Sequence, residues 1–175
     1  MSVHAVFEYD ASDHYQASRA VTRHTSMRYL VWVMPAVALA LLVWNIGPMW
    51  GEYPLSTLFW SGLPYLLLGL FWVMLVPLMQ RRAAKRLPEV DASVKGPQER
   101  IIDIDGYHSR GNGVSIDVPW HAMIRGVETD RYFLFFYNKQ YAYYLPKRVL
   151  EPPQIATVRE LMQVGLGSRA QVRSV

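Results

Sequence analysis

Two long apolar runs, separated by a short connection, constrain this chain more than any other feature of its sequence. The first extends from Tyr29 to Ile46, and the second extends from Leu55 to Met79 without a single Lys, Arg, Asp or Glu. A helix needs about 20 mostly apolar residues to cross a hydrocarbon layer about 30 Å thick. Both runs meet this requirement, so the sequence predicts a transmembrane hairpin with spans at about 29–46 and 55–79.

The positions of the basic residues predict the topology of this hairpin. The net charge of +4 comes largely from Lys and Arg residues that flank the two runs, whereas the connection carries only Glu52. The flanking residues are Arg19, Arg23, Arg28, Arg81, Arg82, Lys85 and Arg86. Basic residues accumulate on the cytoplasmic side of short loops. We therefore expect a multi-pass protein of the cytoplasmic (inner) membrane with both termini cytoplasmic, with membrane lipids rather than nucleic acid as its partner.

Before the hairpin, the sequence predicts a strand and then a helix. Residues 3–10 alternate between apolar and polar side chains, which is typical of a half-buried strand that needs partners. Ser12 is a candidate N-cap for a helix that starts near His14. Nothing between Ser12 and Pro35 interrupts the pattern, so we expect this helix to continue into the first span.

After the hairpin, the pattern changes from helical to extended. The second helix should end near Pro88, and a polar linker should follow from Glu89 to Gln98. The Gly111-Asn112-Gly113 sequence predicts a hairpin turn that needs positive φ, and Asn138-Lys139 predicts a second turn. The stretches with strand-like patterns are 100–105, 114–118, 124–128, 131–137 and 140–145.

A C-terminal amphipathic helix completes the predicted elements. It should begin at Pro152-Pro153, where proline is tolerated, and end at Gly165. The fold class is therefore that of an α+β membrane protein, in which the two-helix hairpin is inserted in a small PH-like antiparallel β split barrel with a C-terminal helix. The predicted parts are a strand at 1–11 joining the soluble sheet, a helix and hairpin at 12–88, a domain at 98–165 and a flexible tail at 166–175.

Small residues within the two spans suggest where the helices meet. Ala36 and Ala40 are four residues apart in the first span, and Gly62 and Gly69 are seven apart in the second. Small residues allow membrane helices to approach closely, so these positions are candidates for the contact within the hairpin. The alternative is that Gly and Ala are simply common in membrane helices.

Several segments resemble the YcxB-like C-terminal domain family: Val118–Glu128, Tyr132–Tyr137 and Tyr144–Leu150, with Phe7-Glu8-Tyr9 as the Phe-x-Tyr end of the first strand. The resemblance extends over nearly the whole chain. It implies a PH-like module on a two-span hairpin, and it carries over no catalytic residue. Four of the matching residues are expected to determine the fold: Phe7, Tyr9, Trp120 and Pro146.

No pattern in the chain predicts catalysis, a cofactor or a metal site. There is no Cys, which excludes disulfides, thiolate chemistry and Cys-ligated metals. The five His residues have no metal-ligand spacing, and the chain lacks a Gly-rich phosphate loop and a nucleophile elbow. We therefore expect a protein that is not an enzyme.

The expected function is that of a membrane-anchored cytoplasmic interaction module. The residues predicted to contact anionic headgroups or a protein partner of unknown identity are Lys139, Lys147, Arg148, Tyr141, Tyr143 and Tyr144. A solvated sheet edge is the alternative interpretation of these residues. The alternative function is that of a small subunit in an oligomeric transport or envelope-stress complex, in which the hairpin assembles with copies of itself or with other proteins.

Overall fold

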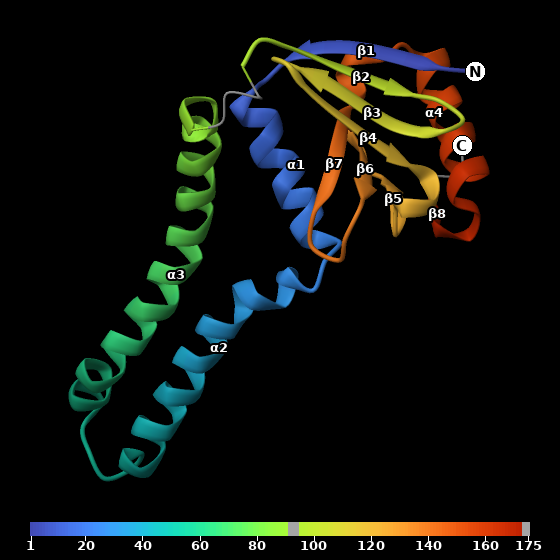
Figure 1. Cartoon of the computed structure of the whole chain (residues 1–175). Coiled ribbons are helices and arrows are strands. Elements are labelled where there is room, and N and C mark those ends of the chain that lie inside the picture. The colour runs from blue at the N-terminus through green and yellow to red at the C-terminus, as the bar shows by residue number, and fades with distance from the viewer. Residues whose placement is uncertain (91–94, 173–175) are drawn as a thin grey trace. The chain divides into compact units, whose positions relative to one another are not determined.

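The chain folds into two compact units with an α+β arrangement of helices and two sheets. The computed structural model describes residues 1–90 and 95–172 (Figure 1). The β unit consists of Met1–Thr25 and Ala83–Val175, and the hairpin unit consists of Ser26–Arg82. The hairpin unit therefore interrupts the sequence of the β unit. Part of the predicted linker (91–94) and the end of the predicted tail (173–175) lie outside the described residues.

The hairpin unit is built from two long helices, each long and apolar enough to cross a membrane. These are α2 (Met27–Ile46), followed by the short helix η1 (Gly47–Met49), and α3 (Leu55–Val90), which continues into the β unit. The mean hydropathy is 1.6 over Trp32–Met49 and 2.0 over an 18-residue window within Leu55–Val90, and only 6% of each window is buried. Because so few of these residues are buried, the helices are not core helices of the described fold.

Within the hairpin unit, α3 presents its glycines to α2. A Cβ atom at Gly62 would lie 2.7 Å from Cδ1 of Ile46, and one at Gly69 would lie 3.7 Å from Cβ of Ala38. The glycine face predicted from the sequence is thus the packing face. The prediction for Ala36 and Ala40 is wrong, because both are exposed and Ala38 is the buried alanine of α2.

The helix before the first span is not continuous with it, contrary to the sequence prediction. Helix α1 (Ala11–Arg23) ends at His24, and α2 begins separately at Met27. The N-cap is Asp10 rather than Ser12, since an Asp10 side-chain oxygen accepts a hydrogen bond from the Ser12 backbone N–H at 2.9 Å. At the other end, the Thr25 hydroxyl donates to the Thr22 carbonyl at 3.1 Å, a side-chain bond that competes with helix continuation.

Sheet A contains four antiparallel strands in the order β1-β2-β3-β4. Strand β1 pairs with β2 along its whole length, with His4 opposite Ile101, so the first strand and the strands after the hairpin share one sheet. The predicted turn joins β3 to β4, with φ of 45° at Asn112 and 80° at Gly113. The strands are β1 (Val3–Glu8), β2 (Pro97–Ile102), β3 (Gly106–Gly111) and β4 (Val114–Pro119).

Sheet B has the order β7-β6-β5-β8 and is antiparallel except for the parallel pair β5–β8. Its strands are β5 (Arg125–Glu128), β6 (Tyr132–Phe136), β7 (Ala142–Pro146) and β8 (Ala170–Gln171). Strand β8 lies in the segment predicted to be a flexible tail, and β3 has no counterpart among the predicted strands. Both differences arise because the pairing depends on tertiary neighbours rather than on a local pattern.

All five residues of β6 are buried, because both faces of sheet B are covered. Phe133 and Phe135 belong to the main core, which sheet A and helix α4 (Pro152–Leu166) share. Leu134 and Phe136 belong to a second cluster, in which Ala17 of α1 packs on the opposite face. Figure 1 shows α1 beside β6 and β7, with α4 on the other side. Helix α1 is therefore part of the β unit.

Trp120 connects sheet A to α4. It is 5% exposed, and its indole N–H donates to the Asp103 carbonyl at 3.0 Å. Its ring lies against Gly165, where a Cβ atom would be 2.4 Å from Cγ of Trp120. Gly165 thus lies inside α4 and does not end it. The helix ends at Gly167, whose φ of 56° favours glycine.

Replacing Gly165 with Ala is expected to destabilise the β unit. An alanine within a helix normally stabilises it by up to about 1 kcal/mol, but here the added methyl group would overlap the Trp120 ring. Overpacking of this kind costs about 1–3 kcal/mol. Urea unfolding in detergent, followed by tryptophan fluorescence, measures the change. The exposed neighbour Val164→Ala should remain close to wild type; equal stability of both variants would contradict the packing.

His108 on β3 connects the β2–β3 turn to β4. Its Nδ1 lies 2.6 Å from an Asp117 side-chain oxygen, and its Nε2 lies 3.2 Å from an Asp103 side-chain oxygen. The hydrogen bond to Asp117 raises the pKa of His108, burial opposes this shift, and the hydrogen bond to Asp103 reinforces it. The folded state therefore favours protonated His108.

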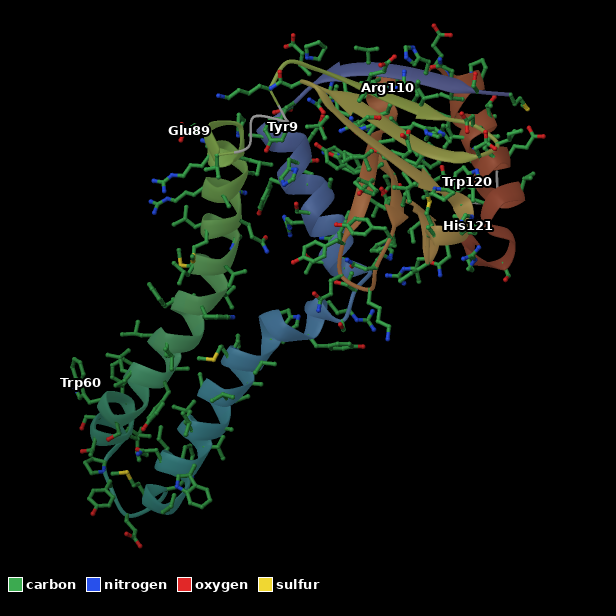
Figure 2. The ribbon with its side chains drawn as sticks, in the orientation of Figure 1. Tyr9, Trp60, Glu89, Arg110, Trp120 and His121 are labelled. Atoms are coloured by element: carbon green, nitrogen blue, oxygen red, sulfur yellow. The ribbon has the colours of Figure 1, made fainter. Side chains whose placement is uncertain are left out.

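This raised pKa predicts a loss of stability on the alkaline side. The stabilisation is complete below the unfolded-state pKa of about 6.5, and it disappears as the pH rises through the higher folded-state pKa. Urea midpoints measured at pH 5.5 and pH 8.5 should therefore fall with pH in the wild type, and His108→Gln should reduce that fall. His121→Gln, at an exposed histidine, should preserve it (Figure 2). A wild-type fall that His108→Gln leaves intact would refute the role of His108.

Candidate lipid- or partner-contact site

Two of the predicted contact residues, Lys147 and Arg148, lie in an open groove of about 480 Å³. The groove runs between the first turns of α1, the β5–β6 turn and the end of β7. Its walls are Asp13, Gln16, Asp130, Arg131, Tyr132, Pro146, Lys147 and Arg148. We call it the α1 groove.

Arg148 uses its charge to hold α1 in the fold. Its Nη2 lies 2.5 Å from an Asp13 side-chain oxygen, and the Tyr132 hydroxyl donates to the other Asp13 oxygen at 3.0 Å. The hydrogen bond to Asp13 raises the pKa of Arg148. Arg131, on the same wall, donates to Gln16 of α1. These cations therefore bind the N-terminal turns of α1, although half of the Arg148 side chain stays exposed.

Lys147 is not a free surface cation either. It forms an ion pair with Glu128, whose side chain is 0% exposed, and is itself only 13% exposed. Arg159 of α4 donates to both oxygens of the same carboxylate, at 2.8 and 2.9 Å. Because a buried carboxylate needs compensating charges, the cluster Glu128–Lys147–Arg159 belongs to the interior of the fold. Lys147 consequently has little surface left for a headgroup.

Glu128→Gln is expected to cost about 3–5 kcal/mol of unfolding free energy. The substitution would leave the charges of Lys147 and Arg159 uncompensated at a mostly buried site, which is the costly way to break a buried pair. Urea unfolding of the full chain in detergent measures the loss. Glu160→Gln, at an exposed residue next to Arg159, is the matched control and should change little. A Glu128→Gln midpoint like that of Glu160→Gln would rule out the buried cluster as a structural element.

The predicted tyrosines do not form one surface with these cations. Tyr143 points into the main core, where its ring stacks on Tyr107 with centroids 5.0 Å apart, and burial raises its pKa. Tyr144, the next residue of β7, faces α1 and meets the ring of His14 edge-on at 5.9 Å. The alternation of side chains along a strand separates the two tyrosines.

Lys139 and Tyr141 lie together in the turn between β6 and β7. We call this turn the hairpin tip (residues 137–141); it is the tip of the β6–β7 hairpin in the β unit and is not part of the hairpin unit. The Asn138 side-chain oxygen accepts hydrogen bonds from the backbone N–H groups of Gln140 and Tyr141, at 2.8 and 2.7 Å. This ordered turn leaves Lys139 exposed and Tyr141 57% exposed. Of the six predicted contact residues, these two share an accessible place.

The hairpin tip lies at the end of the β unit where the chain leaves for α2. Arg125, paired with Phe136 at the end of β6, donates to the carbonyl of His24 at the C-terminal end of α1. The Arg125 guanidinium also lies 4.3 Å from the centroid of the Phe136 ring. His24 and Thr25 are therefore neighbours of the strand that leads directly into the tip, as Figure 1 shows for the end of α1.

The four residues predicted to determine the fold have identifiable roles. Phe7 and Trp120 are buried in the main core, and Pro146 is the last residue of β7. The Tyr9 hydroxyl donates to the Ala84 carbonyl at 2.7 Å, which fastens the start of α1 to the last turns of α3; burial raises the pKa of Tyr9 to about 12 (Figure 2).

Sequence patterns did not identify Asp13, Arg125 and Glu128 as organising charges. Glu128 entered the sequence prediction only as the last residue of the strand-like stretch 124–128. Their roles depend on partners far along the chain, such as Arg148 and Arg159, so no local spacing could have indicated them. Among the residues that the structure describes, no three His, Asp or Glu side chains are placed to hold a metal ion.

The comparison with known proteins agrees with the resemblance seen in the sequence, over a shorter stretch. Residues 102–162 match the sequence model of the family described as YcxB-like protein. The match begins at the end of β2 and ends inside α4, so β1, α1 and the hairpin unit lie outside it. No curated protein and no solved structure matches the chain. Residues 102–162, from the end of β2 to α4, are thus similar in sequence to the YcxB-like protein family.

Proposed function

We propose that the protein is an inner-membrane interaction module in which the β unit faces the cytoplasm and contacts anionic lipid headgroups through the hairpin tip. The residues that contact the headgroups are Lys139 and Tyr141. Lys147 and Arg148 are not included, because their charges are paired with carboxylates of the β unit. Tyr137, 39% exposed at the same tip, is added to Lys139 and Tyr141.

The surface of the hairpin unit supports its insertion in a bilayer. The aromatic residues Trp44, Trp50, Tyr53 and Trp60 are exposed around one end of the hairpin. Basic residues occur at the other end, where Arg28 precedes the first span and Arg81 and Arg82 follow the second. Apolar helices with an aromatic belt at one end and arginines at the other are typical of a hairpin with its termini in the cytoplasm.

The architecture of the β unit supports a PH-like module. Two four-stranded sheets enclose one main core, and α4 covers that core through Val158, Leu161 and Met162. This is the element list of a split barrel that is closed by a C-terminal helix. Such modules commonly serve as recognition domains, but the fold by itself implies no particular ligand.

The position of the hairpin tip is the observation that carries the proposal. Arg125 holds the end of α1 beside Phe136, and the tip is the next segment of the chain. Trp32, where the first apolar stretch begins, is seven residues beyond Thr25, which as helix spans about 10 Å. Exposed tyrosines favour the headgroup region of a bilayer, and a nearby Lys gains about 1 kcal/mol from an anionic surface. The tip combines both features beside the segment of chain that leads to the first span.

The absence of Cys from the sequence makes a direct test simple. A single Tyr141→Cys substitution carries an environment-sensitive fluorophore, and the full chain is placed in nanodiscs with or without phosphatidylglycerol. We expect lipids with nitroxide headgroups to quench this label more strongly when phosphatidylglycerol is present. Salt should weaken the quenching, because it screens the attraction of Lys139.

Glu160→Cys is the matched control position. Glu160 is exposed on α4 and follows Arg159, which contacts Glu128. Glu128 is the last residue of β5, whereas Arg125, which lies near the tip, is the first. Its label should show little quenching in either nanodisc. Equal quenching at positions 141 and 160 would disprove a contact specific to the tip. Lys139→Glu on the Tyr141→Cys background should abolish the dependence on phosphatidylglycerol.

A further inference from the structure

Among the described residues of the β unit, the interior cations have partners that explain their positions, with the exception of Arg100. Lys147 and Arg159 share Glu128, and Arg125 binds the partly negative C-terminal end of α1 through the His24 carbonyl. Arg100 of β2 differs. In the part of the chain that the structure describes, no ion pair joins Arg100 to a carboxylate.

Arg100 lies on the inner face of sheet A, half-buried among neutral groups. Its guanidinium is 5.5 Å from the centroid of the Phe7 ring. Both terminal nitrogens donate to the Gln98 side-chain oxygen at 3.3 Å, and one donates to the Glu99 carbonyl at 3.1 Å. The Nε atom is buried and has no hydrogen-bond partner. These neutral acceptors leave the charge of Arg100 uncompensated.

Hydroxyl groups surround this charge. The Tyr107 hydroxyl and Ser109, which is directly opposite Arg100 on β3, are neighbours of this guanidinium. The Tyr143 ring stacks on Tyr107. Burial raises the pKa of both tyrosines, and the charge of Arg100 partly offsets this shift, so the phenols stay protonated as potential donors.

Gly111 leaves space for the Gln98 side-chain amide, which faces Arg100. A Cβ atom at Gly111 would lie 2.7 Å from the side-chain oxygen and nitrogen of Gln98. The absence of a side chain at Gly111 therefore makes room for the Gln98 amide, which is 5% exposed. The sequence thus accommodates a neutral amide beside the guanidinium.

A half-buried guanidinium without a counter-charge is costly, because it has lost water and gained no carboxylate. An anion that reached it would gain charge-assisted hydrogen bonds and add to the stability of the fold. We propose that Arg100, with the hydroxyls of Tyr107 and Ser109 beside it, binds one oxyanion of the phosphate class. The phosphate arrives either as free inorganic phosphate or as the headgroup of an anionic lipid. This site is independent of the contact proposed for the hairpin tip.

The first experiment tests free phosphate. Inorganic phosphate is titrated with the full chain in phosphatidylcholine nanodiscs, and its ³¹P line width reports binding. Arg100→Gln should weaken the association by about tenfold or more, as expected for hydrogen bonds to a charged group. Arg110→Gln is the matched control, because Arg110 is exposed on the neighbouring strand β3 and carries the same charge (Figure 2).

The second experiment tests the lipid source. The chain is purified in detergent from membranes that contain phosphatidylglycerol, in buffer without phosphate, and native mass spectrometry counts the bound anionic lipids. Arg100→Gln should lose one such lipid that Arg110→Gln retains. Lys139→Glu should retain it as well, which separates this site from the hairpin tip.

The outcomes separate the two sources and expose a wrong proposal. Binding in the first experiment alone assigns the site to free phosphate, and retention in the second alone assigns it to a lipid. The proposal is overturned if neither experiment distinguishes Arg100→Gln from Arg110→Gln. If Arg100→Gln does not fold, Arg100→Lys replaces it; this variant keeps the charge but loses the planar fork, and wild-type binding by it would also overturn the proposal.

Discussion

The burial of β6 on both faces is the constraint on which the rest of the β unit depends. A five-residue strand of aromatic and aliphatic side chains excludes water only if something covers each side of sheet B. Sheet A and α4 cover one side through the main core, and α1 covers the other through Ala17 and its neighbours. This requirement explains why α1 packs on the β unit rather than extending α2.

Charge placement follows from the same packing. Holding α1 on sheet B requires anchors at both ends, and these are Asp13 with Arg148 at one end and Arg125 with the His24 carbonyl at the other. On the far side, Arg159 fastens α4 to β5 through Glu128. Several basic residues that the sequence suggests as binding residues thus hold helices on the sheets through ion pairs and hydrogen bonds. The cations that remain for a ligand are those outside this framework, such as Lys139 at the hairpin tip and Arg100 inside sheet A.

Much of the fold could be predicted from the sequence because its signals are local. Alternation predicted β1, apolar length predicted α2 and α3, and Asn112-Gly113 predicted the turn between β3 and β4. Strand β3 was missed because Tyr107 and Ser109 share its inner face with Gly111, which gives no apolar alternation. The end of α4 was misplaced because Gly165 serves the close approach of Trp120, and Gly167 supplies the positive φ.

The candidate site was less predictable for a related reason. Residue type and position identified Lys139, Lys147 and Arg148 equally well. Whether each cation faces solvent depends on Glu128 and Asp13, which approach from distant segments. The alternation of Tyr143 and Tyr144 was readable along β7, but which face was interior depended on α1. Sequence patterns therefore indicated the kind of contact residue and left its surroundings undetermined.

The pairing of β1 with β2 has a consequence for biosynthesis. Residues Val3–Glu8 leave the ribosome before the hairpin, yet their partners in Pro97–Ile102 are made only after both apolar runs have been translated. Until then, Val3, Ala5 and Phe7 have no sheet to cover them. The edge of sheet A is closed only when this early segment returns across a long intervening loop, which is an entropically slow step. Completion of the β unit is thereby delayed until the hairpin has been synthesised, and a nascent chain that stalls within the hairpin exposes its first strand.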